Sequence, residues 1–223
     1  MTVAAPRGDR AVPAAGGDAV PVLRLDASPV TAPDPILLMA AAVAAGEEAA
    51  IASDLVTRLR ALGCDAWTDA HGNVVGRRAG RGAGASLPPL LLSAHMDTVV
   101  PGHGVKARVA DGIVRSDGST ILGADDKAGL TAILVALART GNDGEASRPV
   151  ELALTVQEET GLTGAKLMDH RQFEAREAIV IDSAGPVGAI VGKGPAQESL
   201  VVEIHGTASH AGVAPEAGRS EEH

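Results

Sequence analysis

The chain has 223 residues, of which 45% are hydrophobic and 21% charged, and its formal net charge at pH 7 is −9. This length allows one substantial core and a small further domain, and the composition is that of a soluble globular protein. An acidic chain with one Trp, one Phe and no Tyr lacks the basic clusters and stacking aromatics that favour nucleic acids or anionic membranes. We therefore expect a small molecule or a short peptide as partner, with no nucleic acid and no membrane.

The N-terminal part of the chain is predicted to add little to the core. Residues 1–33 are rich in Ala, Pro and Gly and have no hydrophobic period, which predicts a flexible arm. The apolar run from Ile36 to Ala45 is shorter than the roughly 20 residues of a membrane helix, so we interpret it as an amphipathic or buried helix. The single cysteine, Cys64, excludes an internal disulfide and favours a reducing, cytoplasmic location.

The following segments alternate between helical and strand patterns. Helix-favouring composition from Pro35 is interrupted at Gly46, which predicts two helices, the second from Glu47 to Leu62. Further strands are predicted at 65–69, 73–76, 88–94, 150–156 and 178–181, and further helices at 127–139 and 163–173. Unbroken apolar strands that alternate with helices indicate an α/β fold with a mainly parallel sheet covered on both faces.

A change in composition and hydrophobic pattern near Gly192 predicts a domain boundary. Lys193-Gly194-Pro195 has the composition of a linker, and Ser199 to Ile204 alternates like a strand with one exposed face. We expect a first domain over residues 34–192 and a second one that begins at 193. Residues 193–223 are too few for an independent fold without a staple or a partner.

A histidine and an aspartate follow the apolar strand predicted at 88–94. In an open α/β sheet, ligands bind beyond the carboxyl ends of the strands. The spacing of His95 and Asp97 puts both on one face, where a carboxylate can hold the imidazole tautomer that leaves one nitrogen free for a metal. A lone His-x-Asp pair is more often an ordinary surface or core feature.

Acidic residues follow the other predicted strands. Asp125-Asp126 opens a helix, where Asp is also a preferred N-cap, and Asp182 ends the last strand. Glu158-Glu159 directly follows a hydrophobic strand; the two charges repel each other unless a cation or proton intervenes, although a solvated loop is the simpler interpretation. One imidazole and several carboxylates suit zinc, cobalt or manganese, and paired metals lie about 3.5–4 Å apart. The combination predicts a two-metal hydrolase.

The ordered motifs resemble the M20 family of zinc metallopeptidases over roughly Glu47 to Pro215. They are His95-Met96-Asp97, Gly123-Ala124-Asp125-Asp126-Lys127-Ala128-Gly129, Glu158-Glu159-Thr160-Gly161, Asp182, and the lid-like Ser209-His210-Ala211-Gly212-Val213-Ala214-Pro215-Glu216. The segment 180–188 is similar to the peptidase T-like, or tripeptide aminopeptidase-like, branch. The resemblance implies a three-layer αβα zinc-exopeptidase-like catalytic domain and the start of a small α+β lid and dimerisation domain.

The resemblance also implies metal ligands. His95 and Asp182 would bind one metal, Asp125 would bridge both metals, and Glu159 would bind the second. The implied cofactor is a pair of divalent ions, zinc in the first place, with cobalt or manganese as alternatives. In the family, one more histidine reaches the second metal after the lid domain, and no residue of this chain matches it. We therefore expect a chain that is truncated at its C-terminus relative to the family.

Other residues would serve the reaction rather than the metals. By the resemblance, Glu158 is the general base, Asp97 orients His95, and His210 stabilises the oxyanion in a partner's active site, with a turn histidine as the alternative for His210. We interpret Asp126 and Lys127 as helix start and packing. Surface or turn roles are expected for the remaining histidines, which are His71, His103, His170 and His205.

The expected function is that of a metal-dependent exopeptidase that hydrolyses short peptides, an aminopeptidase of the peptidase T-like type. A complete chain would form a homodimer through its lid domain. Two alternatives remain open: an M20-type amidohydrolase or deacylase that acts on a small N-acyl substrate, and an inactive truncated remnant.

Overall fold

The computed structural model describes residues 46–142, 146–194, 200–203, 205–207, 209, 212–213, 216 and 218–220. The chain divides into two compact units, Met1–Ala184 and Gly185–His223, so the division precedes the boundary predicted after Gly192. The predicted arm at 1–33 and the helix predicted before Gly46 lie outside the described residues.

A five-stranded mixed sheet, in the order β1-β2-β6-β3-β7, lies at the centre of the first unit. Its strands are β1 Asp65–Thr68, β2 Val74–Arg78, β3 Leu90–His95, β6 Val150–Thr155 and β7 Glu177–Val180. β3 runs parallel to both β6 and β7, whereas β2 is antiparallel to both β1 and β6. The predicted α/β class is confirmed, and β2 is the strand that runs against the others.

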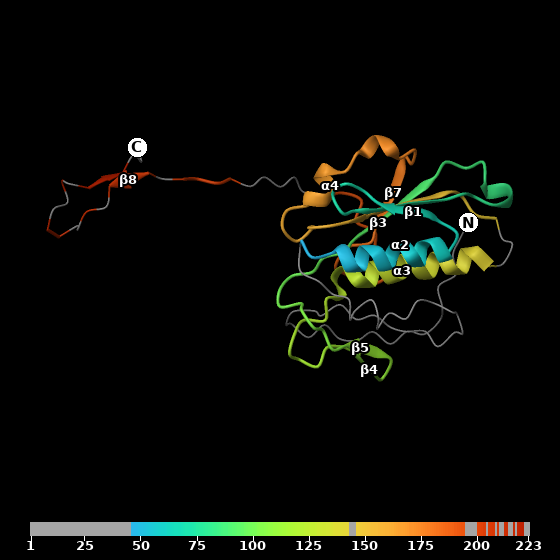
Figure 1. Ribbon diagram of the computed structural model, residues 1–223, viewed down its shortest axis with the longest axis horizontal. Helices are drawn as coiled ribbons and strands as arrows, with labels where there is room; N and C mark the ends of the chain where they lie inside the picture. Colours follow the sequence, from blue (N-terminus) through green and yellow to red (C-terminus); the bar gives the residue numbers. More distant parts are fainter. Residues whose placement is uncertain are drawn as a thin grey trace. The chain divides into compact units, whose positions relative to one another are not determined.

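Two helices cover one face of this sheet. The helices α2, Ala49–Ala61, and α3, Ala124–Asn142, lie side by side in Figure 1. Apolar residues of α2 recur every four positions and are buried, because this spacing keeps them on one helical face. The core that the helices share with the sheet includes Ile51, Leu55, Leu59, Leu130, Ile133, Leu134, Leu137, Leu92 and Leu152.

Shorter segments cover the opposite face. They are α4, Thr163–Leu167, and the 3₁₀ turn η2, His170–Gln172, and Figure 1 shows them across the sheet from α2 and α3. Met168 packs there with Val75 and Ala153. The helix predicted at 163–173 is therefore broken: Met168 is extended, and the Asp169 side chain accepts a hydrogen bond from the Arg171 backbone and caps η2. Asp side chains favour such local bonds over helix continuation.

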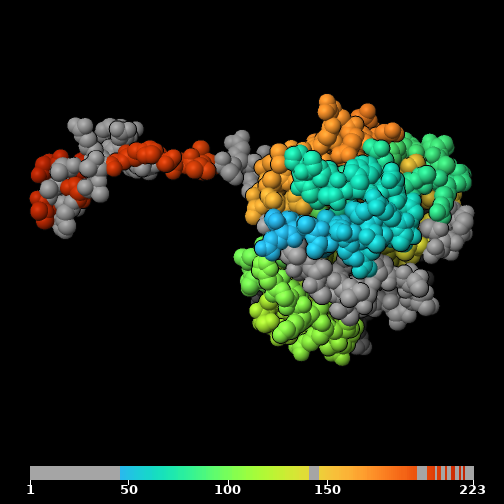
Figure 2. Space-filling model, in the orientation of Figure 1, coloured from blue at the N-terminus to red at the C-terminus, as the bar shows by residue number. Residues whose placement is uncertain are grey.

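A hairpin between β3 and α3 was not predicted. It consists of β4, Arg108–Ala110, and β5, Ile113–Arg115. Asp111 and Gly112 join the strands with φ values of 55° and 71°, the positive pair that a two-residue hairpin turn requires. In the space-filling view, the hairpin's green surface is separate from the blue and cyan surface of α2 and of β1 and β2 (Figure 2).

In the second unit, β8, Gly206–Thr207, pairs with β9, Arg219–Ser220. The predicted strand at 199–204 is not formed at its described residues, 200–203. A strand requires a hydrogen-bonded neighbour, and no described strand pairs with these residues. Among the described helices, none has the length and apolar character to cross a membrane.

Candidate metal centre

The parallel strands β6, β3 and β7 are neighbours, so their carboxyl ends meet at the same edge of the sheet. His95 is the last residue of β3 and lies opposite Thr155, the last residue of β6. The acidic pair Glu158-Glu159 follows β6, and Asp182 follows β7. The first turn of α3 supplies Asp125 to the same edge.

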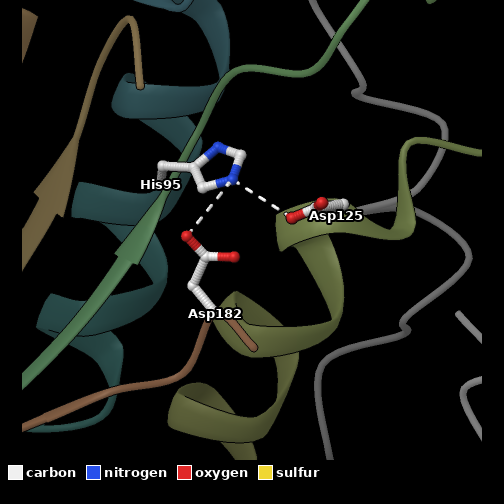
Figure 3. Close-up of side chains that lie close together, drawn as sticks. All are labelled: His95, Asp125 and Asp182. Atoms are coloured by element: carbon white, nitrogen blue, oxygen red, sulfur yellow. Dashed lines mark hydrogen bonds and ion pairs between the residues drawn. The ribbon is translucent and has the colours of Figure 1, made fainter. Parts of the chain in front are cut away.

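Figure 3 shows the carboxylates of Asp125 and Asp182 directed at the same ring nitrogen of His95. The His95 Nε2 atom lies 3.2 Å from Asp125 Oδ1 and 4.0 Å from Asp182 Oδ2. The His95 side chain is 2% exposed, whereas those of Asp125 and Asp182 are 59% and 31% exposed. A buried imidazole nitrogen thus faces carboxylates that open towards solvent.

His95 belongs to two groups of side chains that could hold a metal ion. One group combines it with Asp125 and Asp182, and the other with Glu158 and Glu159. In each group, one ligand atom per residue lies within 4.8 Å of the others. The structure therefore brings together all the metal ligands expected from the sequence, together with the expected base.

Asp97 connects the His95 ring to the segment after β6. Its Oδ1 lies 3.4 Å from His95 Nδ1, and its backbone oxygen lies 3.0 Å from the same nitrogen. The carboxylate also accepts hydrogen bonds from the backbone amides of Glu158 and Glu159, at 3.0 and 3.1 Å. Burial would raise the pKa of Asp97, but these hydrogen bonds and the one to His95 lower it. Asp97 is thus an ionised acceptor that leaves His95 Nε2 facing the carboxylates.

The cluster carries an excess of negative charge. Burial alone would lower the pKa of His95, but its hydrogen bond to Asp97 and the charges of Asp126, Asp182 and Asp97 raise it to about 9. Burial raises the pKa of Glu158, Glu159 and Asp182, and neighbouring carboxylates add to the rise. A divalent cation would offset this repulsion, and one imidazole with several carboxylates is a donor set that suits zinc, cobalt or manganese.

Asp126 and Lys127 lie beneath the cluster. The Asp126 carboxylate accepts hydrogen bonds from the backbone amides of Gly129, at 3.1 Å, and of His95, at 3.2 Å. The first bond is that of a helix start, as expected, while the second joins α3 to the end of β3. The ammonium of Lys127 is fully buried and donates to the backbone oxygens of Met96 and Asp97. Both residues therefore hold the backbone around His95.

The remaining histidines lie apart from the cluster or outside the described residues. His210, predicted to act from the lid, is among the residues that the structure does not describe. The exposed His103 and His205 lie near Glu47 and Glu203. The sequence interpretation missed two buried polar residues beside the site, Glu48 and Asn73. Asn73 follows a His-Gly turn, whereas no local pattern marks Glu48.

A mixed α/β sheet with a histidine and carboxylates beyond the ends of its parallel strands defines the class of zinc-exopeptidase-like domains. Comparison with known proteins agrees with this class. The chain belongs to peptidase family M28, whose model matches residues 73–201.

Solved structures of peptidases resemble the chain. Aminopeptidase PepT from Bacillus cereus superimposes with a TM-score of 0.69 at 32% identity, over 82% of this chain and 51% of that one. A tripeptidase from Staphylococcus aureus gives a TM-score of 0.65 at 36% identity, over 69% of this chain and 43% of that one. Both likenesses support the zinc-exopeptidase-like fold.

Curated relatives point in the same direction. The uncharacterized protein YqjE of Bacillus subtilis is 40% identical over 179 residues, which are 78% of this chain and 48% of the relative. Peptidase T of Serratia proteamaculans is 37% identical over 102 residues, 46% of this chain and 24% of the relative. The chain thus spans about half the length of YqjE and a smaller share of peptidase T.

Proposed function

We propose that the complete protein is a metal-dependent exopeptidase that removes residues from short peptides, as an aminopeptidase of the peptidase T-like, M20 type. The observation that carries the proposal is the convergence of His95 with carboxylates from three elements at one edge of the sheet. The motif order supports the M20 assignment, and relatives named peptidase T and tripeptidase support the substrate class.

The proposed ligands divide between two divalent ions. His95 and Asp182 would hold one ion, Asp125 would contribute to both, and Glu159 would hold the second. The group of His95, Asp125 and Asp182 supports the first of these ions, and a carboxylate oxygen of Glu159 lies within 4.8 Å of a His95 ring nitrogen. Zinc is the proposed ion, and cobalt and manganese are accepted by the same donor set. When bound, such ions lower the pKa of water and polarise a carbonyl oxygen.

Glu158 is the proposed general base. Burial raises the pKa of its carboxyl, which favours both uptake and return of a proton near neutral pH. Glu158 takes a proton from water as the water oxygen bonds to the peptide carbonyl carbon. It then gives the proton to the amine nitrogen as the C–N bond breaks. Asp97 keeps His95 in the tautomer whose Nε2 faces the ligands.

Further parts of the proposal concern the whole protein. A homodimer through the second unit would bring His210 to the active site of the partner, where it would stabilise the developing oxyanion. The single cysteine supports a cytoplasmic location. Equilibrium sedimentation of the complete protein tests the dimer, and a monomer that hydrolyses peptides would contradict the role of His210.

Substitution of the base tests the mechanism. We expect Glu158→Gln to lower kcat for a tripeptide by about 10²–10⁴-fold, because an amide accepts no proton, while the metal content stays at the wild-type value. Glu177→Gln, at an exposed carboxylate of β7, is the matched control and should hydrolyse normally. Unchanged hydrolysis by Glu158→Gln would refute the assignment of the base.

A substrate panel tests the reaction class. It compares tripeptides that have a free α-amine with N-acetyl amino acids, each with added zinc, cobalt or manganese. The proposal predicts hydrolysis of the tripeptides. Cleavage of the N-acetyl compounds alone would establish the deacylase alternative, and a metal-free protein that hydrolyses neither would be the inactive remnant.

A further inference from the structure

In the segment after β6, four successive backbone amides donate hydrogen bonds to side-chain oxygens. The Val156 amide donates to Asn73 Oδ1 at 3.1 Å, and the Gln157 amide donates to Glu48 Oε1 at 3.0 Å. The next amides, of Glu158 and Glu159, donate to the two carboxylate oxygens of Asp97. Acceptors from separate parts of the chain therefore fix the backbone that carries the proposed base and a proposed ligand.

Glu48 holds an unusual position among these acceptors. It is the N-cap residue of α2, yet its side chain makes no capping hydrogen bond to its own helix. Instead it reaches a backbone amide 109 positions further along the chain. The residue is only 4% exposed. Burial of a carboxylate is costly unless it is bonded, so this contact accounts for its place in the interior.

The backbone at Gln157 explains why such an anchor is needed. Its backbone φ of 53° lies in the left-handed region, which residues other than Gly, Asn and Asp rarely adopt. The residue is held on both sides: its amide donates to Glu48, and its carbonyl accepts the Thr163 amide at 3.0 Å. Unfavourable backbone conformations persist at functional sites when the surroundings hold them in place.

A buried cation accompanies this carboxylate. The ammonium of Lys127, which donates to the Met96 and Asp97 oxygens, interacts electrostatically with both Asp97 and Glu48. The two carboxylates that hold the segment after β6 therefore share one buried counter-charge.

We propose that Glu48 is a positioning residue of the metal centre. Through the amide of Gln157, it fixes the turn that directs Glu158 and Glu159 towards His95. The consequence for catalysis rests on the proposed function, whereas the consequence for the backbone does not. Residues that orient metal ligands from behind typically change metal affinity or activity by about 10–100-fold when they are replaced.

The test compares Glu48→Met, which removes the acceptor, with Glu48→Gln, which keeps an acceptor oxygen. Glu48→Asp retains the charge on a shorter side chain and serves if the Met variant does not fold. Glu47→Met is the matched control, because Glu47 is exposed and faces His103. Three measurements are made: hydrogen exchange of the Gln157 amide by NMR, zinc affinity by competition with a chelator, and steady-state kinetics on a tripeptide, which give kcat and KM.

We expect Glu48→Met, or Glu48→Asp in its place, to exchange the Gln157 amide faster and to bind zinc about 10–100-fold more weakly. Its kcat should fall while KM stays near the wild-type value. Glu48→Gln should keep most of the wild-type amide protection, zinc affinity and kcat, and Glu47→Met should match the wild type. A lower melting temperature with unchanged zinc affinity and kcat would reduce Glu48 to a structural role and overturn the proposal.

The outcomes separate this proposal from the proposed function. A wild-type protein that binds no divalent ion would refute the function, and amide exchange at Gln157 would still test the anchor. Exchange at Gln157 that is the same in Glu48→Met and the wild type would refute the anchor, even in an active, metal-loaded enzyme.

Discussion

Asp125 and Asp126 are adjacent acids with different surroundings. The Asp125 side chain is largely exposed and faces His95 Nε2, whereas Asp126 is buried and accepts the His95 and Gly129 amides. The carboxylate that is available to a metal is thus next to one that supports the fold. A stability measurement can separate the two roles.

We expect Asp126→Ala to lower the free energy of unfolding of the metal-free protein by about 1–3 kcal/mol for each buried amide that it leaves without an acceptor. Asp125→Ala is the control and should change the stability little, because that side chain is mostly solvated. Urea denaturation in the presence of a chelator measures both. Equal stability of the two variants would contradict the supporting role of Asp126.

At the residue scale, the sequence indicated which side chains lie close together, because each expected ligand ends or shortly follows a strand or opens a helix. Their roles as ligands stay a prediction. Residues whose partners lie far along the chain were harder to find. Glu48 bonds to Gln157 and Asn73 to Val156, and neither contact leaves a local pattern. Such contacts depend on how α2, the sheet and α4 pack together, which spacing alone does not specify.

At the scale of elements, α3 depends on a glycine that lets it approach the end of β7. A Cβ atom at Gly129 would lie 2.2 Å from Asp126 Oδ1 and 2.4 Å from the backbone oxygen of Ile181. Since Ile181 precedes Asp182, any displacement there also moves a proposed ligand. The helix and the last strand are therefore coupled at the metal centre.

We expect Gly129→Ala to destabilise the protein and to weaken zinc binding. Inside an exposed helix the same change stabilises by about 0.5–1 kcal/mol, so the sign of the effect distinguishes close packing from helix propensity. Gly192→Ala, where a Cβ would meet no atom within 4 Å, is the control. Stabilisation by Gly129→Ala in thermal unfolding would contradict the close approach of α3 and β7.

The sequence predicted the elements with long apolar runs and missed those fixed by short-range turns. β3 and β6 follow their predicted runs closely, because apolar strands in the middle of a sheet are buried on both faces. The β4–β5 hairpin has only short strands, although Asp111-Gly112 is a recognisable hairpin turn. The break after α4 depends on the local bond made by Asp169, which competes with the helix.

At the scale of the whole molecule, Cys64 reports on the integrity of the core. Burial raises the pKa of its thiol and covers it, so the reactive thiolate is scarce in the folded state. We expect Cys64 to react with a disulfide reagent at pH 8 about 10³-fold more slowly than in urea, the lower end of folded-to-unfolded ratios for small domains. Equal rates would contradict a packed core around α2 and β1.

The metal content per chain tests the central claim most directly. Elemental analysis of the purified protein after incubation with zinc should find two ions per chain in the wild type and in His103→Gln, whose imidazole is exposed and lies outside the cluster. His95→Gln should hold fewer ions, because the group formed with Asp125 and Asp182 loses its imidazole ligand. A metal content in His95→Gln equal to that of the wild type, or a wild type that holds no metal, would contradict the account.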